Sequence, residues 1–90
     1  MTKQDLAKKL AKRAGINTSQ AATDIETLMS IMTNAFVEGE SIYLRGFGTF
    51  KVTTRKAKIG QHISAGHAIT IPERQVVVFK AAPVLKDAMN

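Results

Sequence analysis

Apolar residues between positions 1 and 40 recur every three or four residues, which is the period of an amphipathic α-helix. Thr2 and Asp5 have the spacing of a capping box, and Gly15 predicts the C-terminal end of a first helix. Asn17 predicts the start of a second helix that runs to Gly39. Its apolar stripe consists of Ala21, Ala22, Ile25, Leu28, Met29, Met32, Ala35 and Phe36. This stripe is wider than the short first helix can cover.

From Ser41 onward the apolar pattern changes to a period of two, which predicts β-strands. One strand begins at Ile42, and a second includes residues 50–53. Between them, two glycines bracket Phe47 and predict a sharp turn that keeps large apolar groups available for a core.

The last third of the chain predicts two more strands and a short helix. Alternation at residues 69–71 predicts a third strand, and the continuous apolar run at 76–79 predicts a fourth, buried strand. Pro83 suits the first position of a helix over residues 83–89. The expected order is α-α-β-β-β-β-α, an α+β fold with a small antiparallel sheet.

Residues 53–75 are basic and only weakly apolar. Drawn as a hairpin, each leg has about ten residues and reaches roughly 30 Å. Because an isolated two-stranded ribbon is marginally stable in water, we expect an arm that becomes ordered on a partner. A surface loop without order is the alternative.

The charge of the 90-residue chain is concentrated near this arm. The formal net charge is +6 and the sequence pI is about 10.0. Residues 51–75 contain five basic residues against Glu73 alone, so that +4 of the +6 lies there; these residues are Lys51, Arg55, Lys56, Lys58 and Arg74. This concentration indicates a partner rich in phosphate, whereas an evenly spread charge would indicate solubility alone.

The sequence gives little support for other classes of function. The chain has no cysteine, which excludes disulfides and thiolate metal sites. No apolar run has the length of a membrane span, and the N-terminus does not have the pattern of a secretory signal, so we expect a cytoplasmic protein. His62 and His67 stand without a nearby cysteine or carboxylate, and we expect no metal there. No catalytic constellation indicates an enzyme, and neither a cofactor nor a small-molecule substrate is expected.

An ordered set of motifs resembles the HU and integration host factor family, the histone-like, DNA-bending proteins of bacteria. The motifs are Gly-Phe-Gly-Thr-Phe at 46–50, the basic arm with Gly60 and Gly66, residues 69–72, residues 76–80 and residues 85–88. The resemblance covers essentially the whole chain, as a single domain of residues 1–90. It implies an intertwined dimer, with a helical dimerisation part at 1–40, a sheet and arm at 41–80 (the arm about 53–75) and the C-terminal helix at 83–89.

The resemblance also implies the function and its residues. The expected function is architectural, largely non-sequence-specific binding and bending of double-stranded DNA in the nucleoid, with the arms in the minor groove. The expected DNA-binding residues are Lys3, Lys51, Arg55, Lys56, Lys58, Gln61, His62, Ile63, Arg74, Lys80 and Lys86. The expected dimer core comprises Phe36, Phe47, Phe50 and Phe79.

The arm tip departs from the family pattern. The family usually places a proline there that wedges between base pairs, whereas residues 60–66 contain none. Ile63 stands at the wedge position, and isoleucine is one of the apolar residues that unstack base steps. The alternative is that Ile63 is an exposed tip residue of a protein that coats DNA without kinking it.

Two other functions remain open from the sequence. The same arms would suit an RNA or single-strand binder, and a structural self-assembly protein would use them on acidic surfaces of neighbouring copies. A homodimer is expected, with a heterodimer as the alternative.

Overall fold

The computed structural model describes residues 1–62 and 67–90, with side chains described for residues 1–57 and 72–90. The chain divides into two compact units, Met1–Glu38 and Gly39–Asn90. We call them the helical unit and the sheet unit and describe each by itself.

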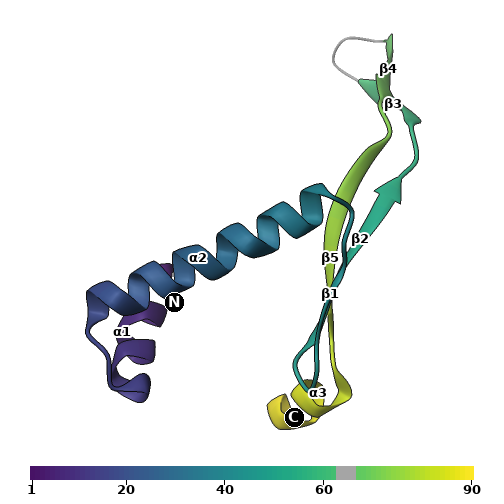
Figure 1. Ribbon diagram of the computed structural model, residues 1–90. Helices are drawn as coiled ribbons and strands as arrows, with labels where there is room; N and C mark the ends of the chain where they lie inside the picture. Colours follow the sequence, from purple (N-terminus) through teal and green to yellow (C-terminus); the bar gives the residue numbers. More distant parts are fainter. Residues whose placement is uncertain (63–66) are drawn as a thin grey trace. The chain divides into compact units, whose positions relative to one another are not determined.

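The helical unit consists of α1 (Lys3–Ala14) and α2 (Thr18–Val37) (Figure 1). The hydroxyl of Thr2 accepts a hydrogen bond from the N–H of Asp5 at 3.2 Å, and the Asp5 carboxylate accepts one from the N–H of Thr2 at 2.9 Å. Gly15 ends α1 in the left-handed conformation, with φ of 71°. The Asn17 side chain caps α2 by accepting a hydrogen bond from the N–H of Gln20 at 2.7 Å. Both predicted helix starts are therefore confirmed.

The core of the helical unit is small. Only alanines are buried in it, namely Ala7 and Ala11 of α1 and Ala21 of α2. Partly buried apolar residues pack around them, namely Leu10, Ile16, Ala22 and Ile25. Farther along α2, the stripe residues Leu28 and Met29 are 57% and 50% exposed. The apolar stripe of α2 thus extends beyond what α1 covers, as the sequence predicts.

The sheet unit contains a three-stranded antiparallel sheet in the order β1-β2-β5, formed by β1 (Ile42–Leu44), β2 (Gly48–Arg55) and β5 (Arg74–Ala81). Strands β3 (Lys58–His62) and β4 (His67–Ile71) form a second, two-stranded antiparallel sheet. α3 (Pro83–Met89) follows (Figure 1). Pro83 lies in its first turn. The expected number of four strands was wrong, because residues 58–62 form a separate strand despite their weak apolar pattern. Their pairing with β4 agrees with the expected hairpin arm.

Both sheets belong to one ribbon. In the β2–β5 pair, Arg55 is opposite Arg74, and in the β3–β4 pair, Lys58 is opposite Ile71. The residue numbers of both pairs have the same sum, 129. The register therefore continues across the gap between the two sheets. Pro72 lies in that gap and has no N–H to donate to the ladder, which is a physical reason for the interruption.

Each glycine of the β1–β2 turn has its own steric reason. Gly46 has a φ of 79°, and the N–H of Phe47 donates to the carbonyl of Leu44 at 2.9 Å, which closes a tight turn. Gly48 is buried, and a Cβ there would lie 2.6 Å from the Lys80 carbonyl oxygen and from the Phe79 ring. The carbonyl of Phe47 accepts a hydrogen bond from the N–H of Ala82 at 2.9 Å, which ties the turn to the start of α3.

The predicted burial of residues 76–79 is wrong for the single chain. Val77, Val78 and Phe79 are 44%, 41% and 41% exposed. The strand is apolar as the sequence indicates, but the sheet unit by itself supplies no second layer that covers it.

Candidate nucleic-acid interface

The strand register places the phenylalanines of the three-stranded sheet on one face and the cations of β2 and β5 on the other, together with Val76 and Val78. Directly paired residues in an antiparallel sheet share a face, and successive residues of a strand alternate between faces. Phe50 pairs with Phe79 on one face, and Lys51 pairs with Val78 on the other. We call these the apolar face and the basic face.

The basic face takes its charges from β2 and β5. Its four cations are all exposed; they are Lys51, Arg55, Arg74 and Lys80. Lys51 is paired with Val78 and Lys80 with Thr49, whereas Arg55 and Arg74 are paired with each other. Neither strand contains an acidic residue. The face therefore presents a positive field along the whole β2–β5 pair, which is the condition for attracting a polyanion.

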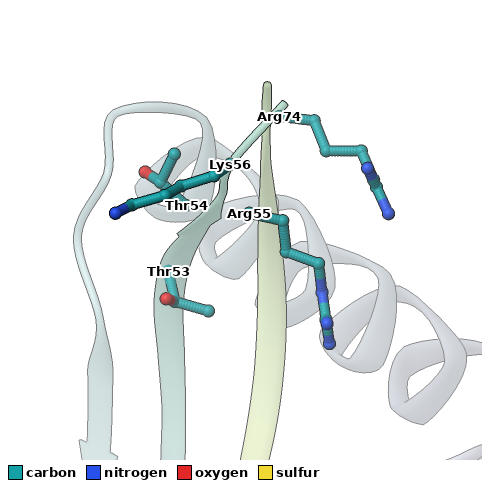
Figure 2. A pocket seen from close by; sticks show the side chains of 5 residues that line it. All are labelled: Thr53, Thr54, Arg55, Lys56 and Arg74. Carbon is teal, nitrogen blue, oxygen red and sulfur yellow. The ribbon is translucent and has the colours of Figure 1, made fainter. Parts of the chain in front are cut away.

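Arg55 and Arg74 are directly opposite each other at the last pair of the three-stranded sheet. Figure 2 shows their side chains extending to the same side of the ribbon, while the Lys56 side chain extends to the other. They line a hollow of about 440 Å³ together with Lys56, Thr53 and Thr54. Like charges directly opposite on one face destabilise a strand pair, so a bound anion between them would relieve the repulsion.

The apolar face carries the predicted dimer-core aromatics of the sheet. The ring of Phe79 lies 5.4 Å from that of Phe47 and 4.8 Å from that of Phe50, measured between centroids. Ile42 and Leu44 of β1 and Val52 and Val77 of the β2–β5 pair are on the same face. Phe47 is nevertheless 47% exposed, so this aromatic cluster is only partly buried within one chain.

The other predicted DNA-binding residues are not on the basic face. Lys3, at the start of α1, forms an ion pair with Glu26 of α2. Lys86 is exposed in the last turn of α3. Phe36, a predicted dimer-core residue, is half-buried near the end of α2.

The arm residues are described in part. Lys58, Gln61 and His62 lie on β3, and His62 is paired with His67 of β4, whereas their side chains lie outside the described residues. Ile63, the wedge candidate, also lies outside the described residues.

Sequence reasoning missed two residues of the basic face. Tyr43 and Thr49 are paired with each other, and Thr49 is paired with Lys80. The signal was present, because Tyr43 alternates with the apolar residues Ile42 and Leu44. Reasoning from charge passed over both residues because they are neutral.

Two other kinds of site are absent from the described part of the chain. No group of three or more histidine, cysteine or acidic residues has the arrangement of a metal site there. No described helix is both long and apolar enough to cross a membrane.

A family model described as bacterial DNA-binding protein matches residues 1–90. The chain belongs to this family. Integration host factor alpha subunits support the membership: those of Sinorhizobium medicae and Bartonella tribocorum are each 36% identical over 86 residues, or 96% of this chain. The match covers 77% and 80% of those two proteins. The resemblance to the HU and integration host factor family is thus confirmed, and this is a family of architectural DNA-binding proteins, not of enzymes.

Solved structures of the family confirm the α+β fold. The structure of an Anabaena HU–DNA cocrystal matches with a TM-score of 0.92 and 26% identity, covering 99% of this chain and 97% of that one. A mutant of HU from Thermotoga maritima matches with a TM-score of 0.74 and 29% identity over the full length of both chains.

Proposed function

We propose that this chain acts as an intertwined dimer that binds and bends double-stranded DNA in the bacterial nucleoid, within the cytoplasm, without catalysing a reaction. The observation that carries the proposal is the basic face, where four exposed cations follow one side of a ribbon. A two-stranded ribbon of this kind can lie in a groove of the duplex, and its cations can neutralise the phosphates that flank the groove. Family membership and the similarity to the Anabaena HU–DNA cocrystal structure support the same assignment.

The dimer is inferred from the apolar surface that a single chain leaves exposed to solvent. The helical unit buries only three alanines, and the sheet unit exposes part of its aromatic cluster. Exposed apolar patches of this extent mark association surfaces. A second copy would cover Phe36, Phe47, Phe50 and Phe79 and supply a second arm. A heterodimer with a related chain would satisfy the same requirement.

The cations of the basic face position the duplex. Arg55 and Arg74 hold phosphate oxygens at the hollow, and Lys51 and Lys80 continue the contact along the sheet. Lys3, Lys56, Lys58 and Lys86 extend the positive field to flanking phosphates. Because phosphate contacts carry no base identity, binding has little sequence specificity.

The arm enters the minor groove and bends the duplex. Gln61 and His62 face groove acceptors whose pattern distinguishes A·T from G·C and little else. Ile63 presses on a base step as an apolar wedge. Bending costs on the order of a few kcal/mol, which the added wrapping contacts offset, so deformable sequences are preferred.

The test uses a short duplex labelled at both ends, with anisotropy reporting binding and energy transfer reporting bending. If about 6–10 phosphates are neutralised, affinity falls by ~10³–10⁵-fold between about 50 and 200 mM salt. An Arg55→Gln/Arg74→Gln variant lowers the slope of log affinity against log salt by about one unit for each phosphate that it no longer neutralises. Lys12→Gln/Arg13→Gln removes the same charge from an exposed end of α1 and leaves that slope unchanged.

Ile63→Ala separates bending from binding. The variant retains most of the affinity and draws the duplex ends together less than the parent protein does. Binding without end approach by the parent protein would instead leave a DNA-coating protein. Preference for RNA or single strands over duplex DNA would refute the assignment, as would large oligomers that form without nucleic acid.

A further inference from the structure

Tyr43 occupies an unusual place for a large aromatic residue. It lies at the centre of β1, an edge strand of the sheet, and its side chain is largely exposed, with the residue 71% accessible. Its neighbours Ile42 and Leu44 belong to the apolar face, so the alternation of the strand places Tyr43 on the basic face.

The register puts Tyr43 in a row with one cation. Tyr43 pairs with Thr49, and Thr49 pairs with Lys80, so these three residues cross the sheet from one edge to the other. Neighbouring members of such a row have Cβ atoms about 5 Å apart. An exposed phenol, a hydroxyl and an ammonium group therefore lie within one stretch of surface.

The charge of this face argues for an anionic partner in contact with Tyr43. A second copy of the chain, applied to the same face, would bring its own Lys51, Arg55 and Lys80 against these cations, and juxtaposed like charges are costly. The apolar face is the side of the sheet that suits another copy. The basic face is therefore available to a polyanion. A tyrosine suits a partly hydrated interface, because it combines an apolar ring with a polar hydroxyl.

We propose that Tyr43 is a DNA-contacting residue on the body of the sheet, outside the arm. Its ring packs against a deoxyribose, and its hydroxyl donates a hydrogen bond to an oxygen of the phosphate that Lys80 attracts. The inference rests on the proposed function and adds a neutral contact to it. Because Tyr43 carries no charge, this contact contributes affinity without adding to the salt dependence.

The composition provides a direct probe. The chain has one tyrosine and no tryptophan, so its intrinsic emission comes from Tyr43 alone. The full-length dimer is titrated with an unlabelled duplex while this emission is followed. In parallel, anisotropy of a fluorescein-labelled duplex measures binding independently for the parent protein, Tyr43→Phe, Tyr43→Ala and a control.

The matched control is Val84→Ala, which truncates an exposed apolar residue on α3, outside both faces of the sheet. We expect the emission of Tyr43 to change and to saturate at the same stoichiometry as the anisotropy. Tyr43→Phe weakens binding by roughly 2- to 5-fold, the size of one hydrogen bond. Tyr43→Ala weakens it by about 10-fold with an unchanged salt slope, and Val84→Ala binds like the parent.

Three results would overturn the inference. Normal anisotropy with unchanged Tyr43 emission and parental affinity of Tyr43→Ala would remove Tyr43 from the interface and leave the proposed function intact. Loss of the dimer in sedimentation experiments on Tyr43→Ala would make Tyr43 a dimer-interface residue. Absence of duplex binding by the parent protein would refute the proposed function itself.

Discussion

The helical unit and the sheet unit both expose apolar surface, but they distribute their charges in different ways. The helical unit contains five basic and four acidic residues, and one of its lysines, Lys3, is paired with Glu26. The sheet unit contains eight basic and three acidic residues, so five of the six net positive charges belong to it. The excess charge is therefore a property of the sheet unit.

The geometry of strands explains why that excess becomes a surface. A strand alternates between two faces, so Lys51 and Arg55 fall on one side while Phe50 and Val52 fall on the other. In α1 the cations Lys8, Lys9, Lys12 and Arg13 also lie on one side of the helix, within about 140° of its circumference. The acidic residues of the helical unit nevertheless nearly balance its basic ones. The sheet unit thus combines a large net charge with one face that holds its phenylalanines and another that holds its cations, whereas the helical unit is nearly neutral overall.

The largest effect that tests this division is expected at the apolar face. Phe79→Ala should lower the free energy of unfolding by about 3–5 kcal/mol, the cost of removing a buried phenylalanine. Within one chain Phe79 is 41% exposed, so this full cost requires a dimer that covers it. Urea unfolding at two protein concentrations measures both the loss and its dependence on association.

Leu28→Ala on α2 is the counterpart in the helical unit, because Leu28 is 57% exposed in the single chain. A concentration-dependent loss in both variants would show that both units contribute to the dimer. A loss below about 1 kcal/mol for Phe79→Ala would mean that the apolar face stays open to solvent.

The next effect concerns the turn that separates the two faces. Gly48→Ala should destabilise the protein by about 1–3 kcal/mol, because its Cβ would meet the Lys80 carbonyl and the Phe79 ring. Gly46→Ala is the matched control: no atom within 4 Å obstructs a Cβ there, and only its φ of 79° opposes the substitution. Its cost is about 1–2 kcal/mol from backbone strain. Thermal unfolding of the two variants separates crowding from strain, and equal stability of Gly48→Ala and the parent would contradict the close packing at Phe79.

A smaller effect is expected at the start of the helical unit. Thr2→Ala removes the N-cap of α1 and should cost about 1 kcal/mol, measured by urea unfolding. Val84→Ala, at an exposed position without a capping role, should cost less.

The same cap predicts a pH dependence. The hydrogen bond from the N–H of Thr2, followed by the bond with its hydroxyl, lowers the pKa of Asp5 below its usual value. A carboxyl with a lowered pKa in the folded state stabilises the protein above its unfolded pKa and loses that contribution as pH falls through the folded value. Unfolding between about pH 5 and 2 should therefore show a loss that Asp5→Asn reduces. An identical pH profile for Asp5→Asn would contradict the role of the capping box.

The smallest effect is expected at the ion pair of the helical unit. Both Lys3 and Glu26 are more than half exposed, so Glu26→Gln should cost less than about 1 kcal/mol in stability. The substitution frees Lys3 for a phosphate and should raise duplex affinity, measured by anisotropy at low salt. The double variant Lys3→Gln/Glu26→Gln serves as the control and should lose that gain. A gain that persists in the double variant would exclude Lys3 from DNA binding.

Local chemistry made several elements predictable. The caps at Thr2 and Asn17, the terminator Gly15 and the helix start at Pro83 depend on hydrogen bonds or dihedral angles within a few residues. The sequence therefore contains everything that decides them. The family motifs are also a property of the sequence, and the match of the family model confirms what they indicate.

Pairing over long distances was less predictable. Residues 58–62 form a strand because residues 67–71 lie opposite them. Their own alternation does not show it, although a hairpin arm was expected over residues 53–75. The exposure of Val77 and Val78 was not predictable either, since burial depends on which surface lies above a strand.

The sequence by itself determined the helix boundaries, the sharp turn at the paired glycines, the excess of positive charge and the family. Only the tertiary structure decided which residues share a face. The register sets Arg55 opposite Arg74 and places Tyr43 in a row with Lys80, and it separates all four from the phenylalanine cluster. The physical reason is that register comes from hydrogen bonds between strands far apart in the chain, and a shift of one residue would exchange the two faces.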